Sequence, residues 1–199
     1  DDAVRMGPLS TKQQLADARS GLADLQRNAE RVQGDPTRTD FAGVAPGVGY
    51  FLEPILLQAT DAAALDPAAA FHHHEVFGPV ATLLPYDGTV ATAAKIVALG
   101  EGSLVGTLYT DDREYTAAAV AGLAPWLGRL VLGTEKIAAA ALSPGCVFPV
   151  CNHGGPGRAG DGAELGGKSG LSFYLQRTTL QGGAAELARL LGTPATSDG

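Results

Sequence analysis

Apolar residues recur at alternating steps of three and four along the first part of the chain. They fall on one face of a helix between residues 10 and 32, and they are Leu15, Ala18, Leu22, Leu25, Ala29 and Val32. Ser10 and Gln13 form a capping-box pattern at the start, and Gly34 with Pro36 supplies a stop. The pattern predicts one long amphipathic helix.

A different rhythm follows a loop rich in Pro, Gly and Thr. Residues 50–57 predict a strand, with Pro54 at an edge or a bend. Apolar runs then alternate with amphipathic stretches, which predicts strands at 80–84, 104–109 and from 130, and helices at 90–98 and 115–123. Near-continuous apolar strands separated by single helices are typical of an α/β fold. We therefore expect a mostly parallel open sheet with helices on both faces.

This alternation stops after Gly133. Residues 153–170 are dominated by glycine, as in a loop whose backbone needs freedom or closely approaches another group. Residues 171–180 alternate and suit a strand, and 184–191 suit a short amphipathic helix. Three units are expected in chain order: residues 1–172 as one α/β portion, 173–182 as a separate strand, and 183–199 as a short helix with a polar tail.

Composition narrows the class of protein. A chain of 199 residues fits one domain, and its 45% hydrophobic and 18% charged residues argue against disorder. The net charge is -7 and no stretch clusters Lys and Arg, which argues against a nucleic-acid or anionic-membrane surface. No apolar run is long enough to span a bilayer. We expect a soluble protein with no nucleic-acid or membrane partner.

The two cysteines, Cys146 and Cys151, are spaced too widely for a CxxC pair. Without a signal-peptide pattern, they indicate a reducing, cytoplasmic setting. No helix start adjoins them, so loop thiols are favoured over nucleophiles, although His153 could lie near Cys151. The chain opens with DDAV and enters a helix within a few residues, so we expect an internal cut rather than a natural start.

Two glycine motifs have both a functional and a structural interpretation. Residues 162–169 match a phosphate-binding P-loop, a site that needs a strand before the loop and a helix after it. Residues 157–161 are no strand, and residues 170–175 resemble a strand more than a helix. Residues 155–160 fit the dinucleotide fingerprint, but with a proline inside the turn. We favour a structural glycine loop and keep a P-loop nucleotide binder as the least favoured function.

Three consecutive histidines, His72, His73 and His74, precede Glu75 and raise the question of a metal site. Consecutive side chains point in different directions in either a helix or a strand, so they seldom converge on one ion. We therefore expect no metal site here.

Residues 75–80, EVFGPV, resemble a characteristic segment of aldehyde dehydrogenases. The neighbouring segments agree in order and spacing: RMGPL at 5–9, GYFLEP at 49–54 and GSLVGT at 102–107. The resemblance extends to Gln181. It implies the C-terminal part of an aldehyde dehydrogenase catalytic domain, with residues 174–181 as the family's oligomerisation strand.

The glycine loop narrows this resemblance. Residues 153–160 read HGGPGRAG where most members have PFGGxKxSG. This is similar to the branch that handles CoA-linked semialdehydes in aerobic aromatic degradation. That branch includes 3,4-dehydroadipyl-CoA semialdehyde dehydrogenase and the dehydrogenase half of the bifunctional ring-opening enzyme of phenylacetate degradation. The resemblance implies NAD(P)-dependent oxidation of a CoA-linked aliphatic semialdehyde to the acid.

The resemblance also implies roles for particular residues. Glu75 would accept hydrogen bonds from the ribose hydroxyls next to the nicotinamide, since a carboxylate is an acceptor-only group. Phe77 would pack beside the nicotinamide, and His153 would lie near the substrate mouth. Arg158 would be a structural or CoA-side contact.

No catalytic residue is implied within this chain. In the family, the nucleophilic cysteine, the base glutamate, the oxyanion asparagine and the cofactor loop all precede the position that matches Asp1. We therefore expect the isolated chain to be inactive, to need the N-terminal half and to form a homo-oligomer through the C-terminal strand. The alternative is a non-catalytic remnant or an assembly module.

Overall fold

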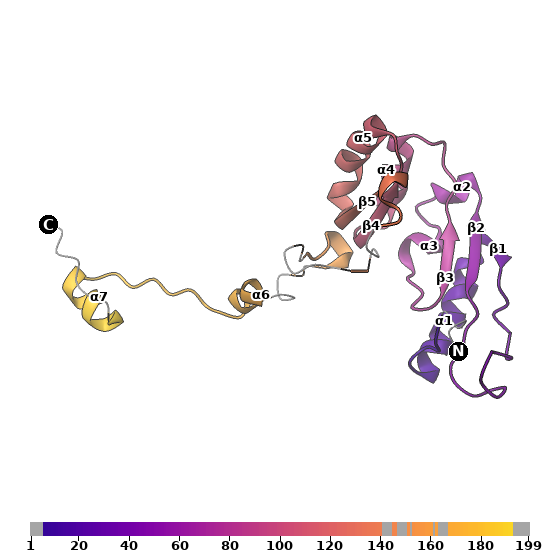
Figure 1. Ribbon diagram of the computed structural model, residues 1–199, viewed down its shortest axis with the longest axis horizontal. Helices are drawn as coiled ribbons and strands as arrows, with labels where there is room; N and C mark the ends of the chain where they lie inside the picture. The colour runs from indigo at the N-terminus through magenta and orange to yellow at the C-terminus, as the bar shows by residue number, and fades with distance from the viewer. Residues whose placement is uncertain are drawn as a thin grey trace.

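The computed structural model of the protein describes residues 6–140, 145–146, 151, 153–160, 162 and 167–192. Two units, each a small sheet with its helices, follow one another along the chain, and we call them the first and the second layer. A long arm leaves them toward the C-terminus (Figure 1). The expected α/β class is confirmed. Among the described residues, two of the three strand pairings are parallel, but the strands lie in two small sheets instead of one continuous sheet.

The first layer holds a three-stranded sheet in the order β1-β2-β3. Its strands are β1 (Ala29–Gln33), β2 (Ile55–Ala59) and β3 (Val80–Leu83), and its helices are α1 (Lys12–Leu25), α2 (Asp61–Ala64) and α3 (Ala70–His73). The central strand β2 pairs antiparallel with β1 and parallel with β3.

The core of this layer lies between α1 and β2. Leu22 and Leu57 are the largest fully buried side chains, and Leu25 and Ile55 pack with them. Alternate residues of β2 face the core because successive side chains of a strand point to opposite faces. Burying each such leucine contributes about 1.5–3 kcal/mol.

The predicted long helix is wrong in its second half. α1 ends at Leu25, and residues 29–33 form β1. Ala29 and Val32 have helical spacing, but Ala29 is buried beside β2 whereas Val32 is 52% exposed. Pairing with β2 satisfies the backbone groups of this segment and overrides the local pattern. The start is also shifted by one residue, because Thr11 caps the helix by accepting from the Gln14 N–H at 3.0 Å.

The predicted strand at 50–57 is displaced toward its C-terminal end. β2 begins at Ile55, directly after Pro54, which has no N–H to give to a neighbouring strand. Residues 50–54 approach as a loop, and Leu52 is nevertheless buried. β2 is therefore a central strand, with the proline outside it.

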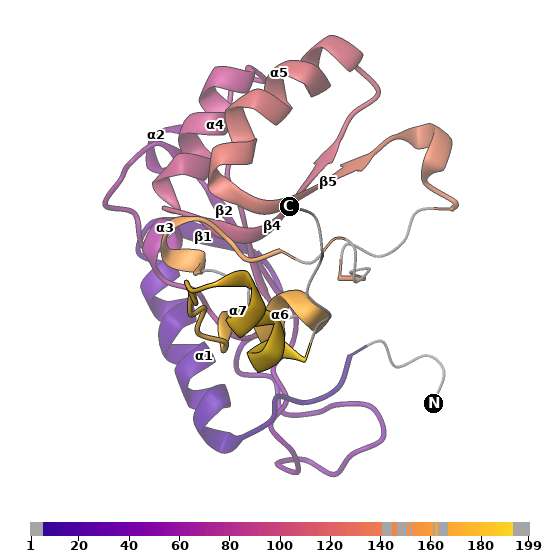
Figure 2. The same ribbon diagram turned by 90° about the vertical axis from the view of Figure 1, so that its left-hand side faces the viewer.

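The second layer matches the sequence pattern more closely. It comprises α4 (Val90–Leu99), β4 (Ser103–Tyr109), α5 (Arg113–Leu123), the short 3-10 turn Ala124–Trp126 and β5 (Leu127–Gly133). β4 and β5 are parallel, and both helices lie together on one side of them (Figure 2). Asp112 caps α5 by accepting from the Glu114 and Tyr115 N–H groups at 2.9 Å.

The C-terminal arm differs from the expected strand. α6 (Gly167–Phe173) includes residues 171–173, and residues 174–183 lie in neither a helix nor a strand. A strand needs a partner for its backbone groups, and the described part of the chain supplies none to this segment. The expected helix at 184–191 is confirmed as α7 (Ala184–Leu191), whereas the tail from 193 lies outside the described residues.

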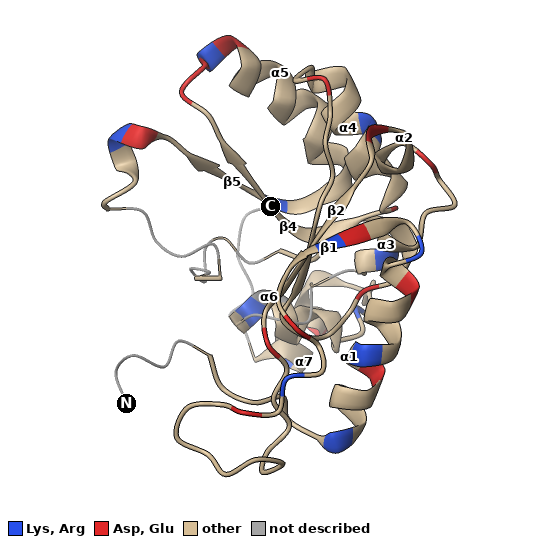
Figure 3. Cartoon of the chain, turned by 90° about the vertical axis from the view of Figure 1, so that its right-hand side faces the viewer, with Lys and Arg blue, Asp and Glu red and all other residues tan. Residues whose placement is uncertain are grey.

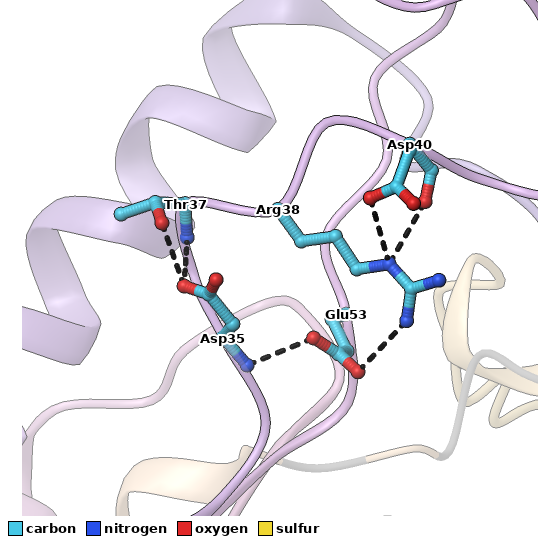
Figure 4. Close-up of polar contacts among 5 residues, drawn as sticks. All are labelled: Asp35, Thr37, Arg38, Asp40 and Glu53. Carbon is cyan, nitrogen blue, oxygen red and sulfur yellow. Dashed lines mark hydrogen bonds and ion pairs between the residues drawn. The ribbon is translucent and has the colours of Figure 1, made fainter.

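A cluster of polar residues holds the loop between β1 and β2 (Figure 4). The Glu53 carboxylate accepts from the Asp35 N–H at 2.8 Å and from the Arg38 guanidinium at 3.2 Å. Asp35 in turn accepts from the Thr37 N–H at 2.8 Å and from its hydroxyl at 2.7 Å, while Arg38 also contacts Asp40. These bonds bring the two ends of the loop together.

We expect Leu57→Ala to lower the free energy of unfolding by about 2–5 kcal/mol, because it opens a cavity at the centre of the core. Urea denaturation followed by circular dichroism measures this. Leu83→Ala in the neighbouring strand is the matched control, since Leu83 is 49% exposed, and it should cost less than about 1 kcal/mol. Equal losses would contradict this account of the core.

The bonds from Thr37 lower the pKa of Asp35 below its ordinary value of 3.8. A lowered folded-state pKa adds stability that is complete above the ordinary value and is lost as the pH falls through the folded value. Asp35→Asn should therefore be less stable than wild type at neutral pH, with a difference that shrinks below pH 3.8. Thermal unfolding across this range measures it. Asp17→Asn is the control, and an equal pH-dependent loss there would refute the assignment.

Candidate functional site

The segment that carries Glu75 begins at α3, a helix of a single turn. His72 is buried in it, and its Nε2 lies 3.1 Å from the Ala64 carbonyl oxygen. Desolvation by burial lowers the pKa of His72. The Ala70 N–H donates to the Asn28 side chain at 3.0 Å, which joins the start of α3 to the turn before β1. α3 is therefore anchored to the rest of the first layer.

The three histidines contact three different neighbours. His72 points inward, the His73 ring bonds to the Pro67 carbonyl, and His74 Nδ1 lies 3.2 Å from the Asp24 carboxylate. Within the ranges that the structure describes, no group of three His, Cys, Asp or Glu residues is placed to hold a metal ion.

Glu75 is exposed and borders two hollows. The larger is about 530 Å³ and is lined by residues 71–75, the turn that leads into β4, and the glycine loop at Arg158. The smaller is about 330 Å³ and lies between α1 and residues 74–77. Phe77 also lines the smaller hollow and is 70% exposed. The fold thus brings both predicted cofactor residues to one hollow.

The backbone that carries Phe77 is held by α1. The Gln14 side-chain amide donates to the Phe77 carbonyl at 3.1 Å. A Cβ at Gly78 would lie 3.2 Å from the Ala18 Cβ, so this segment packs closely on the helix. The approach to β3 is therefore held in place by α1.

His153 lies elsewhere. It is half-buried, its Nδ1 is 2.7 Å from the Gly154 carbonyl oxygen, and its ring packs beside Gly128 at the start of β5. It lines neither of the two hollows beside Glu75. Its predicted place near the substrate mouth stays a prediction.

The glycine loop makes the close approach that its composition predicted. A Cβ on Gly102 would overlap the Pro156 carbonyl, and a Cβ on Gly157 would overlap the Glu101 carbonyl. Glu101 itself has a φ of 58°, the one positive value among the described residues other than glycine. Backbone therefore meets backbone here, because no side chain stands between the two segments.

Arg158 extends from this loop to α3. Its two terminal nitrogens donate to the His72 carbonyl at 3.1 Å and the His73 carbonyl at 2.9 Å. Its backbone N–H donates to the Glu101 carbonyl at 3.1 Å. The sequence predicted a structural or CoA-side contact for Arg158. It did not indicate the two carbonyl partners on α3, which lie 86 and 85 residues away in the chain.

One of the two arguments against a phosphate loop is wrong. A helix, α6, begins at Gly167 inside the match and continues to Phe173, although residues 170–175 were expected to resemble a strand. The other condition is not met, because residues 157–159 form a 3-10 turn and residues 153–156 lie in no strand. Residues 163–166 of the match lie outside the described part of the chain. The same turn occupies the dinucleotide match.

Both cysteines are exposed and free. The Cys146 carbonyl accepts a hydrogen bond from the Arg129 guanidinium at 2.9 Å. Positions of Lys and Arg alternate with positions of Asp and Glu along the described chain, without a continuous basic run in the view of Figure 3. Of the helices that the structure describes, none combines the length and the apolar character needed to cross a membrane.

Comparison with known proteins agrees with this arrangement. The model of the aldehyde dehydrogenase family matches residues 1–180. The chain belongs to this family. The resemblance found in residues 75–80 is thereby confirmed, and α7 lies beyond the matched range.

Two relatives show how much of a whole protein the chain represents. It is 36% identical over 169 residues to Protein MaoC of Klebsiella aerogenes, covering 84% of this chain and 49% of that protein. It is 37% identical over 155 residues to the 3,4-dehydroadipyl-CoA semialdehyde dehydrogenase of Aromatoleum evansii, covering 78% of this chain and 29% of that protein. The chain therefore spans at most about half the length of these relatives.

Solved structures share the fold. The 1-pyrroline-5-carboxylate dehydrogenase from Thermus with bound NAD aligns with a TM-score of 0.63 at 20% identity, over 85% of this chain and 29% of that one. An aldehyde dehydrogenase from Bacillus cereus aligns with a TM-score of 0.62 at 17% identity, over 87% and 30%. The α/β architecture of this chain is thus that of part of an aldehyde dehydrogenase.

We expect Gly157→Ala to destabilise the protein more than Gly160→Ala. Both glycines have a positive φ, of 54° and 78°, so each substitution costs about 1–3 kcal/mol in backbone strain. Only the Cβ at 157 would also overlap the Glu101 carbonyl, whereas the Cβ at 160 would meet nothing within 4 Å. Denaturant unfolding of the two variants compares them. A larger loss for Gly160→Ala would contradict the close approach.

Proposed function

We propose that this chain forms the nicotinamide-side wall of the cofactor site in an NAD(P)-dependent aldehyde dehydrogenase. The observation that carries this proposal is the placement of Glu75 and Phe77 on one rigid segment beside one hollow. The family membership of residues 1–180 supports it, as does the bound NAD in a solved structure with the same fold.

The two side chains have the chemistry that a nucleoside with a nicotinamide ring requires. Glu75 is exposed, and its carboxylate offers only acceptors, so it suits a pair of ribose hydroxyl donors. Phe77 presents a largely exposed aromatic ring, whose apolar face suits a flat heterocycle. When bound, the nicotinamide supplies the hydride acceptor for aldehyde oxidation. The protein's part is to hold the ribose and fix the orientation of the ring.

We propose a CoA-linked aliphatic semialdehyde as the substrate of the whole enzyme. Two observations support this class: the HGGPGRAG loop at 153–160, and 37% identity to a dehydrogenase named for such a substrate. His153 would lie at the substrate mouth, on the loop that joins the two layers. Free cysteines are compatible with the cytoplasmic location that we propose.

We propose that the nucleophile and the base come from the part of the enzyme that this chain does not span. Cys146 and Cys151 do not stand at the place that matches the nucleophile of the family, and both are exposed loop thiols. This chain alone should accordingly show no aldehyde oxidation.

The arm is proposed to pair with a second copy of the chain. Residues 173–182 were predicted as an oligomerisation strand, and residues 174–183 are in no element of the described structure. Tyr174, Leu175 and Leu180 are between 53% and 71% exposed on this segment. Burying such side chains against another copy would stabilise an oligomer. This contact is also what the alternative function, an assembly module, would use.

We expect Glu75→Gln to raise the KM for NAD(P)⁺ by about tenfold in the full-length natural protein, because it weakens charge-assisted bonds to the ribose. Steady-state kinetics with a semialdehyde probe measures this. Glu30→Gln is the matched control, because Glu30 is exposed on β1 and lines neither hollow beside Glu75. A KM for Glu75→Gln that equals the wild-type value would overturn the assigned role.

A further inference from the structure

The end of α3 lies where three separate segments of the chain meet. These segments are the short run from His72 to Glu75, the turn at Glu101 and Gly102, and the glycine loop. The larger hollow opens among these same segments, so whatever holds them together also shapes that hollow.

Helix ends leave backbone carbonyls without partners inside the helix. In α3 the Ala70 carbonyl accepts from the His74 N–H at 2.8 Å. The His72 and His73 carbonyls accept instead from the two terminal nitrogens of Arg158. A guanidinium has a rigid fork of donors, so it fixes the spacing and direction of two acceptors at once. An ammonium group on a flexible stem cannot hold two carbonyls in this way.

Arg158 is itself fixed at its base. Its N–H donates to Glu101, and the neighbouring Gly157 has the positive φ and the close backbone contact that lock the turn. The side chain therefore extends from a backbone that is held by contacts outside α3.

Glu75 lies only two residues beyond the second carbonyl that Arg158 holds. On the other side, the Phe77 carbonyl is held by Gln14 of α1 at 3.1 Å. Residues 72–77 are thus held by hydrogen bonds near both ends of the segment, and Glu75 lies between these bonds. Because α3 has only four residues, its own hydrogen bonds contribute little to the direction of the chain that leaves it.

We propose that Arg158 is a positioning residue for the cofactor site: by clamping the last carbonyls of α3, it fixes the direction in which Glu75 presents its carboxylate. The inference rests on the proposed function, because the effect is expressed through the contact of Glu75 with the ribose. In this proposal Arg158 affects cofactor binding by holding the backbone of α3, and it does not contact the cofactor itself.

The test uses direct binding and needs no turnover. Fluorescence titration gives the Kd of NADPH and of NADH for the full-length natural protein and its variants. We expect Arg158→Ala to weaken binding by about tenfold and Arg158→Lys by a smaller but measurable factor, since lysine keeps the charge and loses the fork. Arg19→Ala on the exposed face of α1 is the matched control and should bind as wild type does.

A double-mutant cycle separates positioning from a direct contact or a general loss of structure. If Arg158 acts through Glu75, then Glu75→Gln combined with Arg158→Ala should bind no more weakly than Glu75→Gln alone. A combined loss equal to the product of the two single losses would overturn the inference. Wild-type affinity in Arg158→Lys would also overturn it, because charge alone would then suffice.

Hydrogen exchange of the cofactor-free protein supplies an independent measurement. Arg158→Ala should speed exchange in the peptide that covers residues 72–77 and leave α5 unchanged. Unchanged exchange at 72–77 would refute the clamp. If Arg158→Ala does not fold, Arg158→Lys carries the same comparison. Normal binding in Glu75→Gln would refute the proposed cofactor role, whereas a defect there with normal binding in Arg158→Ala would refute the clamp alone.

Discussion

Direct contact between backbone segments is the constraint on which the site depends. The glycine loop lies against the turn before β4 because Gly102 and Gly157 have no Cβ to separate them. This contact places Arg158 where its fork meets the end of α3, a short helix that belongs to the other layer. The glycines are therefore structural residues, and they are linked to the segment that carries Glu75 through one long side chain. Neither the phosphate-loop interpretation nor the dinucleotide interpretation is needed to explain this loop.

Periodicity predicted the elements that are stabilised locally. The helices and strands of the second layer lie close to the ranges that the pattern of apolar positions predicted. The pattern failed where a distant partner decides the structure. β1 exists because β2 offers it hydrogen bonds, although Ala29 and Val32 have helical spacing. The arm shows the opposite failure, since an alternating pattern such as that of 174–180 forms a strand only when another strand lies beside it.

The candidate site could be predicted where its residues lie together in one short segment of the sequence. Glu75 and Phe77 were predicted as cofactor residues from the EVFGPV string, and the fold places both at one hollow. The partners of Arg158 were beyond prediction because backbone carbonyls carry no sequence signal. His153 lies in the glycine loop, whose sequence differs from that of most family members, but it packs beside β5 rather than beside Glu75.

The length of the arm limits how far α7 can lie from α6. A fully extended chain advances at most about 3.3–3.6 Å per residue, so residues 174–183 can carry α7 about 30 Å away from α6. Figure 1 shows α7 at the far end of this arm, away from both layers. A molecule that binds α7 would therefore not need to approach the hollows beside Glu75. A contact made by α7 and the shape of the hollows in the folded part can therefore change independently of each other.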